Sequence, residues 1–165
     1  MSQKRLEDKV AIITGGASGI GASAVHVFHE MVPKRHPQSH RHHHHQTWKL
    51  DIMYNNAGIM DHPTIGGILD AKKSDLEKMF EVNLIGAFLG AKHAARVMIP
   101  QRKGCILFTA SACTSIAGLA SHSYAATKYG ILGLAKNLTP DLGQYGIRVN
   151  CISPYGVVTS FPGLL

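Results

Sequence analysis

Residues 10–21 read VAIITGGASGIG, an apolar, β-branched run that stops at two glycines and continues into a helical pattern. The run from Val10 to Thr14 is typical of a buried parallel strand. From Gly19 to Val32 apolar residues recur every three to four positions, which predicts a helix that ends at Pro33. Glycines between strand and helix permit a tight turn and let the backbone approach a pyrophosphate. This stretch predicts a nucleotide-binding unit, with a plain structural turn as the alternative.

The rest of the chain alternates strands with helices. Further strands are expected at 50–54, 105–110 and 147–152, and further helices at 75–99 and 124–142. Ser74, with Glu77 three residues later, predicts a capping box for the first of these helices, and Pro100 its end. Ser123 is expected to cap the second. Strands that alternate with long helices indicate an α/β protein in which helices cover both faces of a parallel sheet.

Length and composition fit one soluble domain. The 165 residues are 45% apolar, which excludes a disordered chain, and no apolar run reaches the roughly 18 residues of a membrane span. The apolar run near the N-terminus is too short for a signal peptide. Three widely spaced cysteines are typical of a reducing compartment, so we expect a cytoplasmic protein without a membrane partner.

The net charge of +7 has a local origin. Residues 34–49 contain four basic residues, no acidic residue and six of the eleven histidines, so the remaining chain carries an ordinary charge and no nucleic-acid surface is expected. We interpret residues 33–49 as a His-rich linker, because their composition lacks periodicity. A metal-binding module is the alternative, but a flexible run offers no fixed ligands, so no metal site is assigned.

Ser111, Tyr124 and Lys128 form a second group of residues, whose side chains can take part in catalysis. Tyr124 and Lys128 are four residues apart at the start of a predicted helix, so their side chains share one face. A nearby ammonium group favours the phenolate and is expected to lower the pKa of the tyrosine, which could then exchange a proton with an alcohol or carbonyl oxygen. Ser111 follows a strand at its carboxyl end, where ligands bind in such sheets. A solvated helix face is the alternative for the Tyr–Lys pair.

Five motifs occur in a familiar order: Thr14-Gly15-x-x-x-Gly19-x-Gly21, Asn55-Asn56-Ala57-Gly58, Asn83, Ser111 and Tyr124-x-x-x-Lys128. Together they resemble the signature of the short-chain dehydrogenase/reductase family. The phrases YNNAGI, from Tyr54, and RVNCISPYG, from Arg148, are similar to the plant secoisolariciresinol and xanthoxin dehydrogenase branch.

The resemblance implies a Rossmann-like, doubly wound parallel sheet in a single domain and a reaction that transfers a hydride between NAD(P) and a secondary alcohol or ketone. Tyr124 would be the general acid/base, Lys128 would lower its pKa and hold the nicotinamide ribose, Ser111 would orient the substrate oxygen, and Asn83 would support a water relay. NAD is the expected cofactor, with NADP not excluded. The implied cofactor-binding residues are Gly15, Ser18, Gly19, Ile20, Gly21, Asn56, Ala57, Gly58, Tyr124, Lys128, Pro154, Val157 and Thr159. Relatives of this kind assemble through the helices at 75–99 and 124–142, which implies a homo-oligomer.

The spacing departs from the family between Gly21 and Asn55, where only 33 residues lie. A complete half of the fold needs on the order of 65 residues there. About 30 residues, one βαβ unit, are therefore expected to be missing. With the family's strands 2, 3 and 7 absent, we expect a truncated domain at 1–165 with about four strands and two open sheet edges. The acidic residue that would bind the ribose 2′-OH falls in the missing block. A catalytically inactive remnant that interacts with intact homologues is the alternative to an active enzyme.

Overall fold

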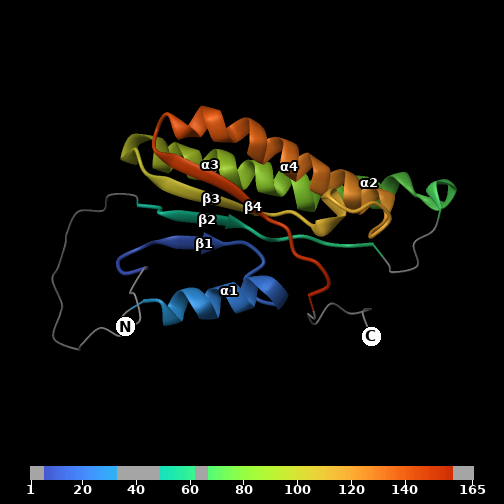
Figure 1. Cartoon of the computed structure of the whole chain (residues 1–165), viewed down its shortest axis with the longest axis horizontal. Coiled ribbons are helices and arrows are strands. Elements are labelled where there is room, and N and C mark those ends of the chain that lie inside the picture. Colours follow the sequence, from blue (N-terminus) through green and yellow to red (C-terminus); the bar gives the residue numbers. More distant parts are fainter. Residues whose placement is uncertain (1–5, 33–48, 62–66, 158–165) are drawn as a thin grey trace.

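A four-stranded parallel sheet forms the centre of the protein. The computed structural model describes residues 6–32, 49–61 and 67–157 (Figure 1). Its strands are β1 (Ala11–Ile13), β2 (Ile52–Asn55), β3 (Gly104–Thr109) and β4 (Ile147–Ile152), and they lie side by side in that order. All three strand pairs are parallel: Ile12 lies opposite Met53, and Tyr54 lies opposite Leu107. The predicted α/β class and the four strands are confirmed.

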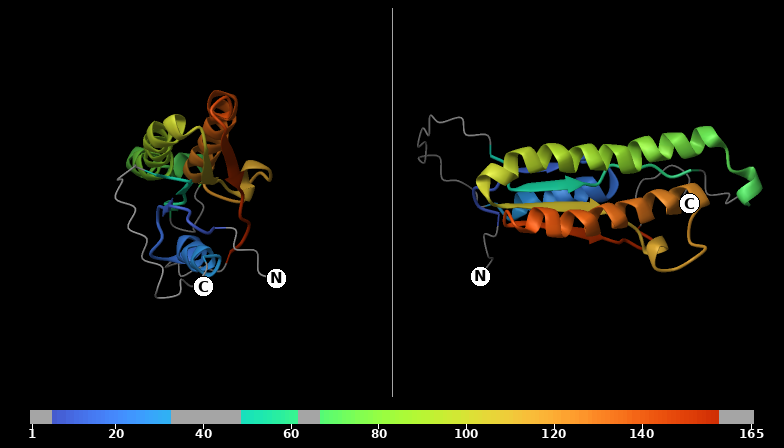
Figure 2. Two further views of the ribbon diagram at one scale, coloured as in Figure 1. Left: turned by 90° about the vertical axis from the view of Figure 1, so that its left-hand side faces the viewer. Right: turned by 90° about the horizontal axis from the view of Figure 1, so that it is seen from above.

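Helices cover both faces of the sheet, as Figures 1 and 2 show. Helix α1 (Gly19–Glu30) lies alone on one face, while α3 (Gly86–Gln101) and α4 (His122–Gly143) lie side by side on the other. Helix α2 (Lys73–Met79) precedes α3 and joins it through the π-helical turn η2 (Phe80–Ile85). Two short 3₁₀ turns, η1 (Ile68–Asp70) and η3 (Ala112–Thr114), complete the described elements. No helix in the described ranges has the length and apolarity needed to cross a membrane.

The hydrophobic core lies between the sheet and the α3–α4 layer. Met98 of α3, Ile131 of α4, and Ile106 and Phe108 of β3 are almost completely buried in it. On the other face, α1 buries only Gly21 among its own residues, and Val25 and Val27 remain more than a third exposed. Since burial of apolar surface is the main source of stability, the α3–α4 side holds this fold together.

Both outer strands are sheet edges within the described part of the chain. The strand order begins with β1 and ends with β4, and no other strand pairs with either of them there. For the chain as a whole, two open edges stay a prediction. The expected linker at 33–49 lies, apart from its last residue, outside the described residues.

Several predicted helix boundaries were wrong. The expected helix at 75–99 begins at Lys73, contains the π turn η2 and runs past Pro100, which lies in its last turn. Ser74 does not cap it, because Lys72 occupies the N-cap position, and no side chain bonds to the backbone there. Helix α4 starts two residues earlier than predicted, and Ser121 caps it.

Candidate active site

The glycine loop between β1 and α1 is shaped by close backbone contacts. Gly15 and Gly19 have φ angles of +66° and +52°, in the left-handed region that favours glycine. A Cβ atom on Gly21 would overlap the carbonyl oxygen of Gly15 and lie 2.7 Å from Nδ2 of Asn56. Ser18 precedes α1, but its side chain makes no capping hydrogen bond. The first turn of α1 therefore keeps its N–H groups available for an anionic ligand.

The turn after β2 packs directly against this loop. Oγ1 of Thr14 accepts hydrogen bonds from the backbone N–H groups of Asn56, at 2.9 Å, and Ala57, at 3.0 Å. Nδ2 of Asn56 donates to the carbonyl oxygen of Thr14 at 3.2 Å, and its Oδ1 accepts from Oγ1 of Thr109 at 3.0 Å. The glycine loop and the Asn55–Gly58 turn, some forty residues apart in sequence, thus form one continuous surface, the floor of the site, at the carboxyl ends of β1, β2 and β3.

Asn83, inside the π turn η2, binds the backbone of Ile59 in the segment that follows β2. Its Oδ1 accepts from the N–H of Ile59 at 2.7 Å, and its Nδ2 donates to the carbonyl oxygen of Ile59 at 2.9 Å and to Oγ1 of Thr127 at 3.2 Å. The side chain is buried. It therefore ties the segment after β2 to helix α4. The water relay expected of Asn83 stays a prediction.

Lys128 lies buried behind Tyr124, on the same face of α4. Its Nζ donates to the carbonyl oxygen of Thr109 at 2.8 Å and lies 5.3 Å from the centre of the Tyr124 ring. Burial lowers the pKa of Lys128 to about 8, although the Cys113 and Cys151 thiolates would act in the opposite direction. A cation held by a single carbonyl oxygen in a largely dry site is readily deprotonated.

The pKa of Tyr124 differs in direction from the prediction. Burial, followed by the proximity of Cys113, raises the pKa of the Tyr124 phenol, and its hydrogen bond with Ser111 lowers it by less. The expectation that Lys128 lowers the pKa of Tyr124 was therefore wrong for the protein without ligand. The physical reason is that desolvation of the phenolate exceeds the stabilisation that its neighbours provide.

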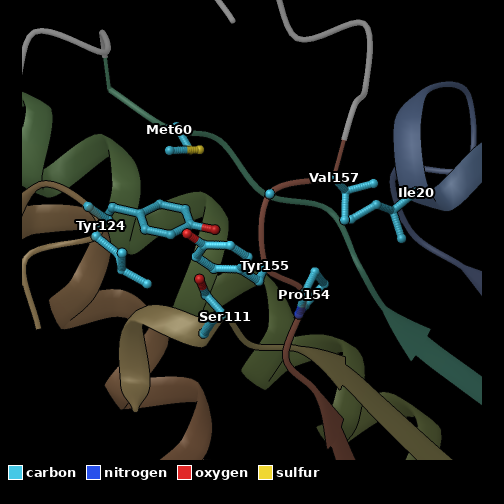
Figure 3. Close-up of a pocket in the computed structure, with 11 residues that line it drawn as sticks. Ile20, Met60, Ser111, Tyr124, Pro154, Tyr155 and Val157 are labelled. Atoms are coloured by element: carbon cyan, nitrogen blue, oxygen red, sulfur yellow. The ribbon is translucent and has the colours of Figure 1, made fainter. Parts of the chain in front are cut away.

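Tyr124 and Ser111 face a common cavity of about 340 Å³ (Figure 3). Ile20, from the start of α1, and Val157, from the segment after β4, lie side by side at the other end of it. Tyr155 stands between these groups and points toward Tyr124, as Figure 3 shows. The carbonyl oxygen of Pro154 accepts from the N–H of Ala112 at 3.0 Å, which fixes the segment after β4 beside Ser111.

The structure brings most of the predicted site residues together. Those that line the cavity are Ile20, Ser111, Tyr124, Pro154 and Val157. Those in the adjoining floor and behind Tyr124 are Gly15, Gly21, Asn56, Ala57, Gly58, Asn83 and Lys128. Gly19 and Ser18 shape the start of α1. Thr159 lies outside the described residues.

Sequence reasoning missed several residues that build the site. Thr14 and Thr109 provide the hydrogen bonds that join the three strand ends, and Met60 and Tyr155 line the cavity. Thr14 is the first residue of the quoted glycine motif, but the sequence predicted no hydrogen bonds for it. Ser121 could have been found, because a capping serine lies three residues before the N–H group that it binds. The role of Thr109 depends on contacts across the sheet, which leave no local signal.

Comparisons with known proteins identify the family of this chain. The family model described as short chain dehydrogenase matches residues 34–163. The chain is 52% identical, over 94% of its own length and 69% of the relative's, to a (21S)-21-acetoxyl-apo-melianone synthase from Melia azedarach. It is 50% identical, over 98% of its length and 72% of the relative's, to tropinone reductase-like 1 from Erythroxylum coca. Secoisolariciresinol dehydrogenase from Forsythia intermedia is 41% identical over 95% of this chain and 69% of that enzyme, which confirms the resemblance to that plant branch.

A solved structure shows the same architecture. The complex of 4-hydroxyisoleucine dehydrogenase with NADH superposes with a TM-score of 0.76, at 26% identity, over 93% of this chain and 78% of that one. The alignment with tropinone reductase-like 1 runs over 195 positions, whereas this chain has 165 residues. By subtraction, at least 30 positions of that relative have no counterpart here. The matching motifs, the shared fold and the identity to these relatives lead to one conclusion: the chain belongs to the short-chain dehydrogenase/reductase family.

Proposed function

We propose that this chain transfers a hydride between NAD(P) and a secondary alcohol or ketone, with Ser111, Tyr124 and Lys128 as its catalytic residues. The observation that carries the proposal is the cavity in which the Ser111 and Tyr124 side chains face the same space, with Lys128 buried behind the tyrosine ring. Membership of an oxidoreductase family supports the reaction class.

The residues present fit the nicotinamide and pyrophosphate parts of the cofactor. The glycine loop leaves the backbone bare at Gly15 and Gly21, where a Cβ would meet neighbouring backbone. The uncapped N-terminus of α1 suits a pyrophosphate. Ile20, Pro154 and Val157 offer an apolar surface for a nicotinamide ring at one end of the cavity. When bound, the nicotinamide would supply or accept the hydride. The segment from Gly16 to Ser18 carries no basic residue, which favours NAD over NADP.

Fewer residues of this chain are available to bind the adenosine part of the cofactor. No acidic residue occurs in the sequence between Glu30 and Asp51, where the acid that binds a ribose 2′-OH is expected. Loss of a hydrogen bond to a charged group costs about 1.5–3 kcal/mol. We therefore propose that NAD(H) binds roughly 10 to 100 times more weakly than it would with that acid in place.

Tyr124 would move the proton between the protein and the substrate oxygen. Because burial raises its pKa, Tyr124 is protonated at neutral pH and suited to donate a proton to the oxygen of a ketone that receives a hydride. Ser111, hydrogen-bonded to the same phenol, would hold that substrate oxygen in place. Lys128, with a pKa of about 8, would carry the positive charge that stabilises the phenolate left after the transfer. Near pH 7 Tyr124 is therefore in the protonation state that reduction of a ketone requires.

A catalytically inactive partner of intact homologues is the second candidate function. The observation that favours it is the weak attachment of α1, which buries only Gly21 of its own residues, beside β1, the outer strand of the described sheet. The outer face of α3 exposes Phe88 and Leu89, which would suit an assembly through this helix layer. The same surface would serve a homo-oligomer of an active enzyme. We also propose a cytoplasmic location, because the three cysteines of the described chain are free thiols.

A cofactor titration separates the two functions. The melting temperature of the purified chain would be measured with NAD(H) and NADP(H) from 0.1 to 10 mM. An enzyme should be stabilised as its cofactor binding saturates. Cyclohexanone with NADH, followed at 340 nm, then tests turnover, with Tyr124→Phe as the inactive reference. A melting temperature that stays constant with all four nucleotides would exclude the enzyme and leave the inactive partner.

A further inference from the structure

Ser121 makes two hydrogen bonds that connect helix α4 to another part of the chain. Its Oγ accepts from the backbone N–H of Tyr124 at 3.1 Å, which makes it the N-cap of α4. The same hydroxyl donates to Oδ1 of Asp61 at 2.6 Å. A length of 2.6 Å is typical of an O–H group that donates to a carboxylate, and such bonds are about twice as strong as neutral ones. Asp61 and Ser121 are sixty residues apart in sequence.

Asp61 belongs to the segment after β2, which is bound to the site at several points. Thr14 binds the segment at Asn56, and Asn83 binds it at Ile59. Met60 lies between Ile59 and Asp61 and lines the cavity that Tyr124 faces (Figure 3). The bond from Ser121 to Asp61 therefore connects the residue next to Met60 to the N-terminus of the helix that carries Tyr124.

We infer that Asp61 and Ser121 are positioning residues: they hold the Tyr124 phenol at a fixed position relative to Met60 and Ser111. The inference rests on the proposed function. Neither residue is among the described residues that line the cavity, so both would act through Tyr124. Tyr124 is the third residue of α4, inside the first turn, which frays when a cap is lost. A carboxylate beside this N-terminus also interacts favourably with the helix dipole.

The effects of substituting Asp61 and Ser121 differ depending on whether Ser121 only caps the helix or acts with Asp61 to position Tyr124. A cap needs only the bond from Oγ of Ser121 to the N–H of Tyr124, so Asp61 would be dispensable. A positioning pair needs both residues, and removal of either one releases the same contact. The effects of the two substitutions should therefore be non-additive, as for residues that act as one unit.

Four single variants and one double variant test the inference: Asp61→Ala, Asp61→Asn, Ser121→Ala, Ser121→Thr and Asp61→Ala with Ser121→Ala. The kcat and KM values for cyclohexanone and NADH are measured for each, together with the melting temperature. We expect Asp61→Ala and Ser121→Ala each to lower kcat about tenfold, with the KM for NADH changed less than twofold. Asp61→Asn and Ser121→Thr keep an acceptor and a hydroxyl in place, so they should retain at least half of the wild-type kcat. The double variant should be no slower than the slower single variant.

A second readout does not depend on turnover. The absorbance of tyrosinate at 295 nm is titrated between pH 8 and 12, and the difference between each protein and its Tyr124→Phe counterpart isolates Tyr124. Loss of the Ser111 hydrogen bond should move this midpoint upward by at least half a pH unit in Asp61→Ala and Ser121→Ala. Lys128 and Cys113, which also face Tyr124, are unchanged in every variant.

The results separate the inference from the proposed function. If Asp61→Ala lowers the melting temperature but leaves both kcat and the Tyr124 midpoint at their wild-type values, the positioning role is disproved. Additive effects in the double variant would disprove it as well. If the wild-type chain and Tyr124→Phe are equally inactive, the proposed function fails, and the midpoint of Tyr124 alone decides whether Asp61 and Ser121 position the phenol.

Discussion

The side-chain nitrogen of Lys128 lies 5.3 Å from the centre of the Tyr124 ring, close enough for a cation–π contact. The nitrogen also donates to the carbonyl oxygen of Thr109 at 2.8 Å, so β3 holds it behind the tyrosine. Burial acts on both partners in the direction of the neutral form: it raises the pKa of Tyr124 and lowers that of Lys128. Both side chains therefore become charged less readily here than they would in water.

The first prediction concerns Tyr124. Tyr124→Phe removes the hydroxyl that would donate the proton and leaves the ring, so turnover of cyclohexanone should fall at least about 100-fold. Stabilisation by NADH should remain, because the glycine loop is unchanged. Steady-state rates and melting temperatures with NADH measure the two effects. Tyr129→Phe, at an exposed position of the same helix, is the matched control and should keep the wild-type rate. Equal loss of activity in both variants would contradict the assignment.

The second prediction concerns the pH dependence of stability. The pKa of Lys128 is about 8 in the folded chain and near 10.5 when exposed, so the unfolded state binds more protons between these values. Stability must therefore rise with pH in this window, by up to about 3 kcal/mol, relative to a variant without the amine. Urea unfolding of wild type and Lys128→Met from pH 7 to 10 measures the difference.

Lys136→Met, at an exposed position of the same helix, is the matched control for the loss of an amine. A constant difference between wild type and Lys128→Met across this pH range would mean that the pKa of Lys128 is not lowered by burial.

The third prediction concerns the glycine loop. Gly21→Ala would place a methyl group against the carbonyl oxygen of Gly15 and 2.7 Å from Nδ2 of Asn56. The loop must shift, so stability should fall by about 1–3 kcal/mol and stabilisation by NADH should be lost. Gly133→Ala in α4 meets no atom within 4 Å and should stabilise the chain by roughly 0.5–1 kcal/mol. Denaturant unfolding with and without NADH compares the two; similar behaviour of both variants would argue against a packed loop.

The fourth prediction concerns Asn83. Asn83→Ala removes three hydrogen bonds and leaves the N–H and carbonyl groups of Ile59 without a partner. A loss of about 3 kcal/mol of stability is expected, since each unsatisfied buried group costs about 1–3 kcal/mol. Asn137→Ala, at an exposed position of α4, should change stability by less than about 0.5 kcal/mol. A small effect of Asn83→Ala would show that the segment after β2 is held by other contacts.

The fifth prediction concerns α1. Because α1 buries only Gly21 of its own residues, its amide hydrogens should exchange faster than those of α3 and α4, which pack on the core. Binding of NADH at the start of α1 should slow exchange in that helix first. Hydrogen exchange followed by mass spectrometry, with and without 5 mM NADH, measures both effects. Equal protection of α1 and α3 in the absence of NADH would contradict this view of the fold.

Much of the fold was predictable because its signals are local. The apolar run before Gly15 and the periodic pattern after it placed β1 and α1 nearly correctly, and the predicted 147–152 strand matches β4. Helix boundaries were less predictable. Pro100 lies within α3 rather than beyond it, because packing of this helix on the core outweighs the backbone hydrogen bond that the proline cannot donate.

The sequence by itself determined the family and the order of strands and helices, and it predicted most of the residues that the structure brings together around the cavity. Periodicity and motif spacing carry this information along the chain. Only the tertiary structure decided which hydrogen bonds join those residues and in which direction their pKa values are shifted. The direction of the Tyr124 pKa depends on how far burial desolvates the phenol, and the bond from Ser121 to Asp61 joins residues sixty positions apart. Desolvation and long-range contacts are properties of the packed chain, because they arise only when distant segments exclude water together.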